Sequence, residues 1–344
     1  MMQAGIFNIH TDRFSTRLGK YERILTHNGI KCIRLDIHDP DFWKHLENLD
    51  LFIYEGQKHT VATEIARSVL PVIDHNKHIK CIPGISTFWP CNDRIKSYYL
   101  LRQTGFPVPQ TYIFWHKSRA LEWVRNAPLP LVFKLKTGIG AQNSFVINCQ
   151  KQAKLLINRM FGKGVCVSEI SSSRDQAYKL YPERILDKAS SEMRGIFSNM
   201  SEFIWEKQKN YVLFQEYISE RKSEVRILVI GNRAFVLEAH SHDQYGSVRN
   251  NLNKGYQGTE ELCMEMAFDI CRKLKVRYIT GIFIVDKENR PFITDLTFDI
   301  PSDTEVVKGY WDHEFRWHNG PFWPEYFCLE DLLVIHDMKH PDIS

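Results

Sequence analysis

The stretch Pro130-Leu-Val-Phe-Lys-Leu-Lys-Thr-Gly-Ile-Gly-Ala-Gln-Asn-Ser144 decides how the rest of the sequence is interpreted. Its apolar run ends at Lys134 and is typical of a strand that is buried on both faces. The turn that follows contains Gly138 and Gly140, and a second apolar run comes after it. Glycine lets backbone N–H groups approach a phosphate, and a nearby lysine supplies positive charge. Taken alone, the stretch predicts a strand–loop–strand unit, in which an ordinary turn is favoured over a phosphate site.

Composition limits the classes of protein that this chain can belong to. It has 344 residues, 43% of them hydrophobic and 25% charged, with a formal net charge of +4. That charge is too small, and too evenly mixed in sign, to indicate nucleic-acid binding. No apolar stretch approaches the roughly 18 residues that a membrane-spanning helix needs, so we expect no membrane insertion. The eight cysteines form no Cys-x-x-Cys pair, which favours reduced thiols in a cytoplasmic protein.

The first ninety residues alternate short apolar runs with amphipathic segments. This alternation predicts a parallel sheet covered by helices, forming a domain over residues 1–90. We expect strands at 4–9, 30–35 and 51–54, and helices at 21–27, 42–49 and 60–70.

The second segment, residues 91–165, contains the quoted stretch. A helix is expected over residues 92–105, capped by Asn92 or Asp93 and ended by Gly105. A strand at 112–114 and a helix at 120–125 precede the strand–loop–strand unit, and a helix at 152–161 follows it.

The third segment, residues 166–344, begins with a polar stretch, 171–205, which is interpreted as a solvated insert or lid. Strands are expected at 211–218, 224–230 and 233–239, a helix at 260–275, and a closing hairpin at 279–285 and 291–296. The aromatic residues at 308–327 favour core packing under a long loop over a stacking platform for a sugar or base.

The order of these motifs resembles that of the ATP-grasp superfamily over residues 90–300. Pro130 to Leu135 and the Gln215-Glu-Tyr-Ile218 strand are similar to patterns in the glutamate-ligase and glutathione-synthase branches. The resemblance implies an ATP-grasp fold, of mixed α/β and α+β class, with an N-terminal Rossmann-like domain before it. A looser similarity is to ATP-grasp proteins of bacterial surface-polysaccharide gene clusters.

The resemblance also implies which residues bind ATP. Lys134 and Lys136 would contact phosphate oxygens, and either Arg94 or Lys96 would supply a further phosphate contact. Gln215, Glu216, Tyr217 and Ile218 would read the adenine through their backbone, and Glu224 would take the ribose hydroxyls, with a cross-strand ion pair as the alternative for Glu224.

The remaining implied residues concern catalysis and metal binding. Arg226 and Arg249 would face the transferring phosphoryl group, with Asn251 beside them, because positive charge there stabilises the transition state. The Mg²⁺ ligands of the superfamily fall partly on residues that cannot ligate, such as Phe283. Asp295 and Asp299 are left as the expected metal ligands, with Asp286 as a substitute.

These expectations lead to an ATP-dependent carboxylate–amine ligase that works through an acyl phosphate and uses ATP and Mg²⁺. Its partners would be a small carboxylate, such as a uronic acid or an amino acid of surface-polysaccharide biosynthesis, and an amine; a homodimer stays open. Because the metal site is altered, the second hypothesis is a regulatory or inactive nucleotide-binding protein of the same fold, without ligase activity. A carbohydrate-binding module based on the aromatic tail is a third. The run His240-Ser-His-Asp243 is interpreted as polar surface rather than a metal site.

Overall fold

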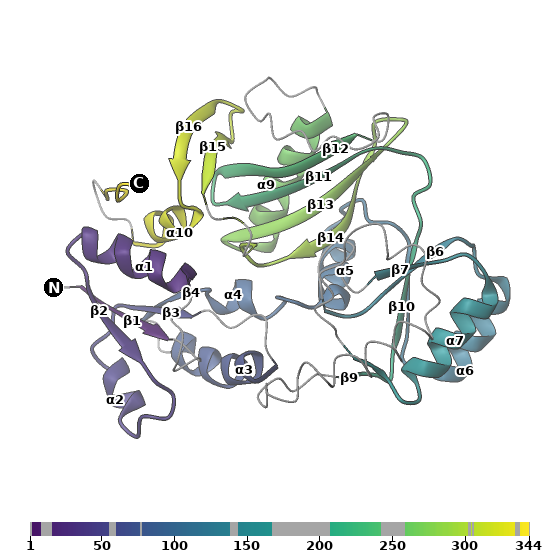
Figure 1. The fold of residues 1–344 in the computed structure, drawn as a ribbon, viewed down its shortest axis with the longest axis horizontal. Helices are drawn as coiled ribbons and strands as arrows, with labels where there is room; N and C mark the ends of the chain where they lie inside the picture. Colours follow the sequence, from purple (N-terminus) through teal and green to yellow (C-terminus); the bar gives the residue numbers. More distant parts are fainter. Residues whose placement is uncertain are drawn as a thin grey trace, which may run out of the picture. The chain divides into compact units, whose positions relative to one another are not determined.

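A computed structural model describes residues 2–7, 16–54, 60–75, 78–137, 144–166, 207–241, 259–301, 304, 306–333 and 338–343 (Figure 1). The chain packs into two compact units. Unit 1 comprises Met1–Cys91, Lys222–Pro291 and Leu296–Ser344, and unit 2 comprises Asn92–Arg221 and Phe292–Asp295. The units are defined by packing, whereas the segments 1–90, 91–165 and 166–344 were defined by sequence. Those three segments stay a prediction.

Unit 1 begins with a four-stranded sheet in the order β2-β1-β3-β4, in which all neighbouring strands are parallel. Parallel strands need helical crossovers, and helices alternate with these strands along the chain. The parallel sheet that the sequence predicted is therefore confirmed. The elements are β1 (Gln3–Phe7), α1 (Thr16–His27), β2 (Lys31–Leu35), α2 (Phe42–Leu46), β3 (Leu51–Tyr54), α3 (Thr60–His75), β4 (Lys80–Ile82) and α4 (Ile85–Phe88).

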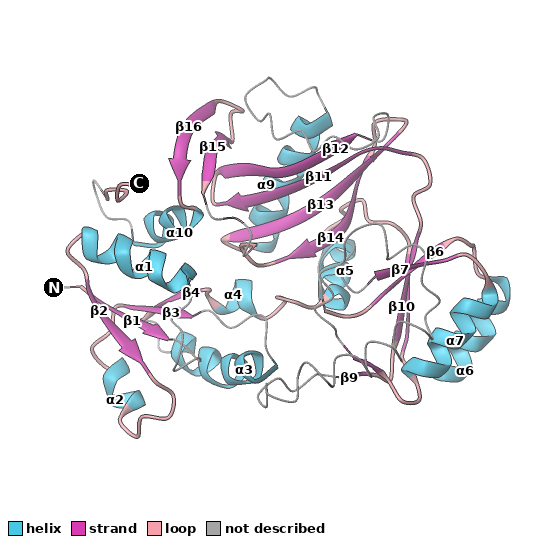
Figure 2. Ribbon diagram, in the orientation of Figure 1, coloured by secondary structure: helices cyan, strands magenta, loops and turns pink. Residues whose placement is uncertain are grey.

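Unit 2 is built on an antiparallel sheet in the order β5-β10-β6-β7. Helices α6 and α7 lie side by side against this sheet (Figure 2). Phe133 of β6 and Phe214 of β10 are fully buried in one hydrophobic core cluster, and Trp123 stacks on Phe214. The elements are α5 (Arg94–Gln103), β5 (Thr111–Phe114), α6 (Lys117–Trp123), the 3-10 turn Val124–Asn126, β6 (Leu131–Lys134), β7 (Ser144–Ile147), α7 (Gln150–Met160), β8 (Val165–Cys166), β9 (Lys207–Gln208) and β10 (Val212–Glu216).

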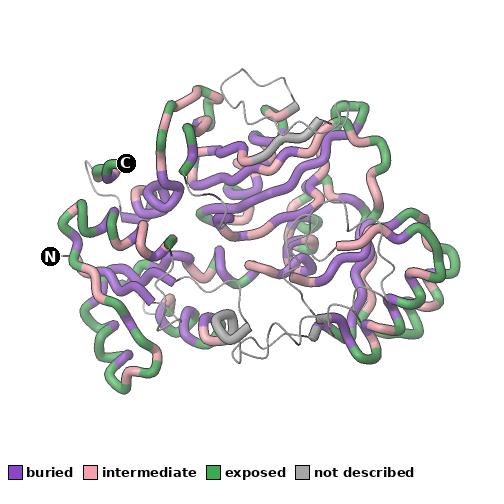
Figure 3. Tube along the Cα trace, in the orientation of Figure 1, coloured by how far each residue is buried: buried purple, intermediate pink, exposed green. Residues whose placement is uncertain are grey.

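A second sheet has six strands in the order β14-β13-β11-β12-β15-β16, and α9 packs against β12 and β13. Its residues belong to unit 1, apart from Phe292–Asp295 of β14 and Arg221 of β11, which belong to unit 2. Both hairpins expected from the sequence are present in it. Strand β13 is buried along its whole length, as Figure 3 shows for the centre of this sheet. The elements are β11 (Arg221–Ile230), β12 (Arg233–Ser241), α9 (Thr259–Leu274), β13 (Tyr278–Asp286), β14 (Pro291–Thr297), β15 (Val307–Asp312), β16 (Trp317–Phe322) and α10 (Pro324–Leu333).

The aromatic tail belongs to this second sheet rather than to a long loop. Strands β15 and β16 extend the sheet, and α10 follows them. Tyr310, Phe322 and Phe327 pack against one another, with ring centroids 5.1–5.6 Å apart. The core packing expected of these rings is therefore present, but two strands and a helix provide it rather than a segment under a long loop. The polar stretch 171–205 lies outside the described residues.

Candidate functional site in unit 2

Lys134 lies where the quoted stretch placed it, at the end of a buried strand. It is the last residue of β6 and is itself buried. Its Nζ donates a hydrogen bond of 2.6 Å to the backbone carbonyl of Thr294 in β14. Gly138 and Gly140 lie outside the described residues, so their place in a phosphate loop stays a prediction.

Arg94 is the first residue of α5 and is also buried. Its Nε and Nη2 donate to Oδ2 of Asp295 at 3.0 and 2.8 Å. Its Nη1 donates to the carbonyls of Leu135 and Thr137, and its backbone N–H donates to the carbonyl of Lys136 at 2.8 Å. Arg94 therefore holds three consecutive carbonyls at the point where the chain leaves β6.

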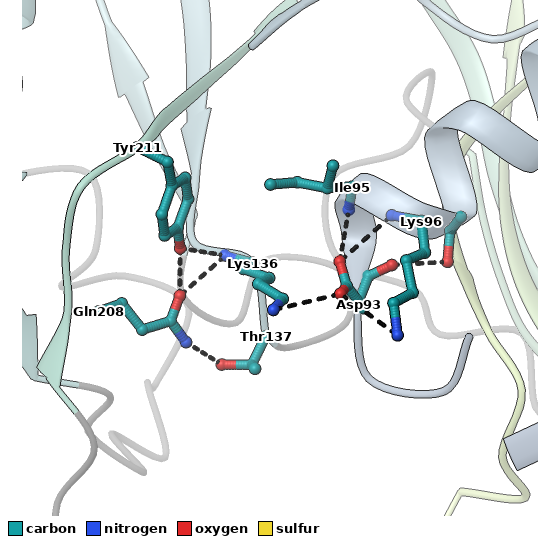
Figure 4. A network of polar contacts seen from close by, with 8 residues as sticks. Asp93, Ile95, Lys96, Lys136, Thr137, Gln208 and Tyr211 are labelled. Atoms are coloured by element: carbon teal, nitrogen blue, oxygen red, sulfur yellow. Dashed lines mark hydrogen bonds and ion pairs between the residues drawn. The ribbon is translucent and has the colours of Figure 1, made fainter. Parts of the chain in front are cut away.

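Asp93 caps α5 and brings two lysines together (Figure 4). Its Oδ1 accepts hydrogen bonds from the backbone N–H groups of Ile95 and Lys96, as expected for an N-cap aspartate. Its Oδ2 lies 3.3 Å from Nζ of Lys136 and 4.0 Å from Nζ of Lys96. The side chains of these lysines are 36% and 38% exposed, whereas that of Asp93 is 4% exposed. The result is a partly exposed cationic pair fixed on a buried carboxylate.

The backbone at Lys136 is also held from the β9–β10 side (Figure 4). Its N–H donates to the hydroxyl of Tyr211 at 2.6 Å and to Oε1 of Gln208 at 3.0 Å. The Tyr211 hydroxyl donates to the same Gln208 oxygen, and Nε2 of Gln208 donates to Oγ1 of Thr137. Together with Arg94, these contacts fix residues 135–137 from two sides.

Sequence reasoning missed these supporting residues. Asp93 was expected only as a helix cap, and Gln208 and Tyr211 had no assigned role. The Asp-Arg-x-Lys order at residues 93–96 was a usable signal, because a capping carboxylate lies close to side chains of the first helical turn.

The end of β10 carries the four residues expected to read adenine. Gln215 is buried, and its Nε2 donates to Oγ1 of Thr111 at 3.2 Å, so its side chain supports the sheet. Glu216 is exposed, and Tyr217 and Ile218 are half-buried. Arg221 donates to the carbonyl of Ile218 at 2.8 Å, and its guanidinium lies over the ring of Tyr217.

Two further expected site residues, Glu224 and Arg226, belong to unit 1. Glu224 and Arg226 alternate along β11, so both lie on one face of the strand, while Val225 is buried on the opposite face. In register they lie opposite His240 and Glu238 of β12. Arg249 and Asn251 lie outside the described residues, and so does the end of the His240–Asp243 run.

Each carboxylate expected to hold a metal already faces an arginine. Asp295 faces Arg94, and Oδ1 of Asp299 accepts from Nη1 of Arg17 at 3.1 Å. Asp286 accepts from the backbone and the side chain of Arg290 at 2.8 and 2.7 Å. These hydrogen bonds outweigh burial and lower the pKa of Asp286. Among the described residues, no three His, Cys, Asp or Glu side chains gather as a metal site would require.

The comparisons with known proteins agree with this architecture. Residues 131–300 match the family described as the RimK-like ATP-grasp domain. No curated protein matches the chain significantly in sequence. The resemblance to the ATP-grasp superfamily is confirmed, and the chain has an ATP-grasp fold of mixed helices and sheets.

Three solved structures illustrate the similarity. A RimK domain ATP-grasp protein from Sphaerobacter thermophilus is 13% identical with a TM-score of 0.51, covering 88% of this chain and 93% of that one. The macrocyclase MdnC from Microcystis aeruginosa, bound with its precursor peptide MdnA, is 12% identical with a TM-score of 0.52, covering 97% and 100%. N5-carboxyaminoimidazole synthase from Aspergillus clavatus, in complex with ADP and 5-aminoimidazole ribonucleotide, is 10% identical with a TM-score of 0.50, covering 89% and 72%. At these identities the likeness concerns the fold alone.

The membrane expectation can be compared with the helices of the described ranges. None of them combines the length and the apolar character that crossing a bilayer requires.

Proposed function

We propose that this chain is an ATP-dependent ligase that joins a carboxylate to an amine, releasing ADP and phosphate. The observation that carries this proposal is the pair Lys96 and Lys136, held at the start of α5 and after β6 by the buried carboxylate of Asp93. Two partly exposed ammonium groups held close together suit the oxygens of a nucleotide phosphate. The match to the ATP-grasp family supports the same class of ligand.

In this proposal the carboxylate substrate is phosphorylated first, and the amine then attacks the acyl phosphate. The residues of this chain would position the reactants and neutralise charge, because phosphoryl transfer depends chiefly on both. Lys134 and Lys136 would contact phosphate, residues 215–218 the adenine and Glu224 the ribose. The transferring group would be stabilised by Arg226, Arg249 and Asn251. For Arg249 and Asn251 this role rests on the sequence alone.

Mg²⁺ is implied by the ATP-grasp resemblance, but the described carboxylates do not fit a metal held by the protein. Mg²⁺ prefers hard oxygen ligands in octahedral geometry. Asp295, Asp299 and Asp286 each already compensate an arginine, and Phe283 offers no oxygen. No step of the proposed reaction is therefore assigned to a metal held by these residues.

The poor fit of these carboxylates to Mg²⁺ supports one alternative function, that of a nucleotide-binding protein of the same fold without ligase activity. The deciding experiment measures ADP release with a panel of uronic acids, amino acids and acidic peptides, each with and without an amine. The peptides are included because MdnC is bound with a peptide. ADP release that needs both an acid and an amine supports the ligase. ATP binding in calorimetry without any ADP release supports the alternative, and no binding overturns both.

A further inference from the structure

Arg94 and Asp295 form a buried pair 201 residues apart in sequence. Their side chains are 4% and 2% exposed. The guanidinium donates four hydrogen bonds, two to Asp295 and one each to the carbonyls of Leu135 and Thr137. A guanidinium has five N–H donors, so these contacts leave it little capacity to bind a further ligand.

The pair changes what Asp295 can do. A carboxylate already bound to a buried guanidinium has its charge compensated, and taking it away would leave a buried arginine without its partner. A divalent cation at the same oxygens would also be repelled by Arg94. Asp295 is therefore better suited to binding Arg94 than to binding a metal.

The pair also determines where Lys136 lies. Through Asp295, the guanidinium is oriented so that Nη1 reaches the carbonyls on both sides of Lys136. The backbone N–H of Arg94 takes the carbonyl of Lys136 itself. Tyr211 and Gln208 hold the N–H of Lys136 from the other side. With its backbone fixed, Lys136 directs its Nζ toward Asp93.

We propose that Arg94 and Asp295 form an internal ion pair that positions Lys136 for a nucleotide phosphate, and that Asp295 does not bind a metal ion. The proposal rests on the proposed function in that the positioned group is expected to contact a nucleotide. Arg94 is accordingly a positioning residue rather than a phosphate contact, which assigns the expected phosphate role at the start of α5 to Lys96.

The test measures ADP binding by calorimetry, in excess Mg²⁺ and in EDTA, for the wild type and Asp295→Asn. A positioning role predicts that Asp295→Asn weakens ADP binding about tenfold, by the same factor in both conditions, since breaking a buried pair disturbs the site itself. A role as metal ligand predicts a loss in Mg²⁺ only, which would overturn the proposal. Arg94→Lys, which keeps the charge but cannot reach both carbonyls, should behave like Asp295→Asn. The exposed pair Arg119 and Glu122 of the same unit provides matched controls, Arg119→Lys and Glu122→Gln, which should bind ADP normally.

Two further measurements need no nucleotide. Electron paramagnetic resonance with Mn²⁺ alone should give the same metal binding for the wild type and Asp295→Asn; Mn²⁺ that is lost with Asp295 would contradict the inference. The melting temperatures of Arg94→Met, Asp295→Asn and the double variant should be non-additive, whereas additive losses would show that the two residues are not coupled. If the wild type binds no nucleotide, the proposed function fails, and these two measurements still decide the ion pair.

Discussion

The Nζ of Lys134 donates a 2.6 Å hydrogen bond to the backbone carbonyl of Thr294, 160 residues further along the chain. Thr294 precedes Asp295, which binds Arg94, so these two neighbouring residues of unit 2 each accept from a buried cation of the same unit. Lys134 therefore has a structural contact in addition to the phosphate contact proposed for it.

Replacing Lys134 with alanine tests both roles. Lys134→Ala should abolish ADP release, and it should lower the free energy of unfolding by about 1–3 kcal/mol because the Thr294 carbonyl loses its partner. ADP release and urea denaturation measure the two effects separately. Lys154→Ala, an exposed lysine on α7, is the matched control and should change neither. Full turnover by Lys134→Ala would show that this lysine does not contact the nucleotide.

Two substitutions of Asp93 distinguish its role as a helix cap from the effect of its negative charge. Asn and Asp are about equally good N-caps, so Asp93→Asn should leave stability nearly unchanged, whereas Asp93→Ala should cost about 1 kcal/mol. Both variants remove the carboxylate that faces Lys96 and Lys136. If those lysines bind phosphate, Asp93→Asn should tighten ADP binding roughly three- to tenfold, since the ammonium groups lose a competing anion. Weaker binding by a stably folded Asp93→Asn would indicate that the carboxylate serves to orient the lysines.

Thiol labelling tests the burial of the cysteines. Among the described residues, Cys149 is exposed, whereas Cys81, Cys263, Cys271 and Cys328 are buried. Burial raises the pKa of Cys81 and of Cys263 to about 12, so these thiols stay protonated and unreactive at pH 8. In the native protein, Cys149 should react rapidly with a thiol reagent, and Cys149→Ser should lose one rapidly reacting equivalent. Rapid labelling of Cys263 without unfolding would contradict the packing of α9.

The sequence was sufficient for features that depend on neighbouring residues. The apolar run before Lys134 predicted a buried strand, and the Asp93 position predicted a helix start, because strands and caps are decided locally. The parallel sheet of the first ninety residues followed from the alternation of strand and helix signals.

The partners of the charged side chains could not be predicted in the same way. Arg94 and Asp295 are 201 residues apart, and only the folded chain brings them together. The sequence pattern assigned Arg94 or Lys96 to phosphate and Asp295 to a metal, and it gave no sign that Arg94 and Asp295 would form a pair. The strands of the aromatic tail were also missed. Its dense aromatic residues, with Gly309 and Gly320, give no clear strand period, and β15 forms by pairing with β12, which is distant in sequence.

The final prediction concerns Glu325, a buried carboxylate of α10 that faces α1. Its oxygens lie 3.5 Å from Nζ of Lys20 and 3.7 Å from Nε of Arg17. Burial raises the pKa of Glu325 above its ordinary value of 4.5, although Lys20 and Arg17 oppose the shift. The folded protein therefore holds this proton more tightly than the unfolded chain does. Its contribution to stability is fully present below pH 4.5 and is lost as the pH rises through the raised pKa.

Replacement by glutamine should remove this pH dependence. Glu325→Gln cannot titrate, so the difference in unfolding free energy between wild type and variant should shift in favour of the variant as the pH rises from 4.5. Urea denaturation at several pH values up to 8 measures that difference. Lys20→Met, which removes one opposing cation, should raise the pKa of Glu325 further and extend the wild-type decline to higher pH. A difference between wild type and Glu325→Gln that stays constant across this range would mean that Glu325 ionises as readily in the folded protein as in the unfolded chain, and that the two cations fully compensate its burial.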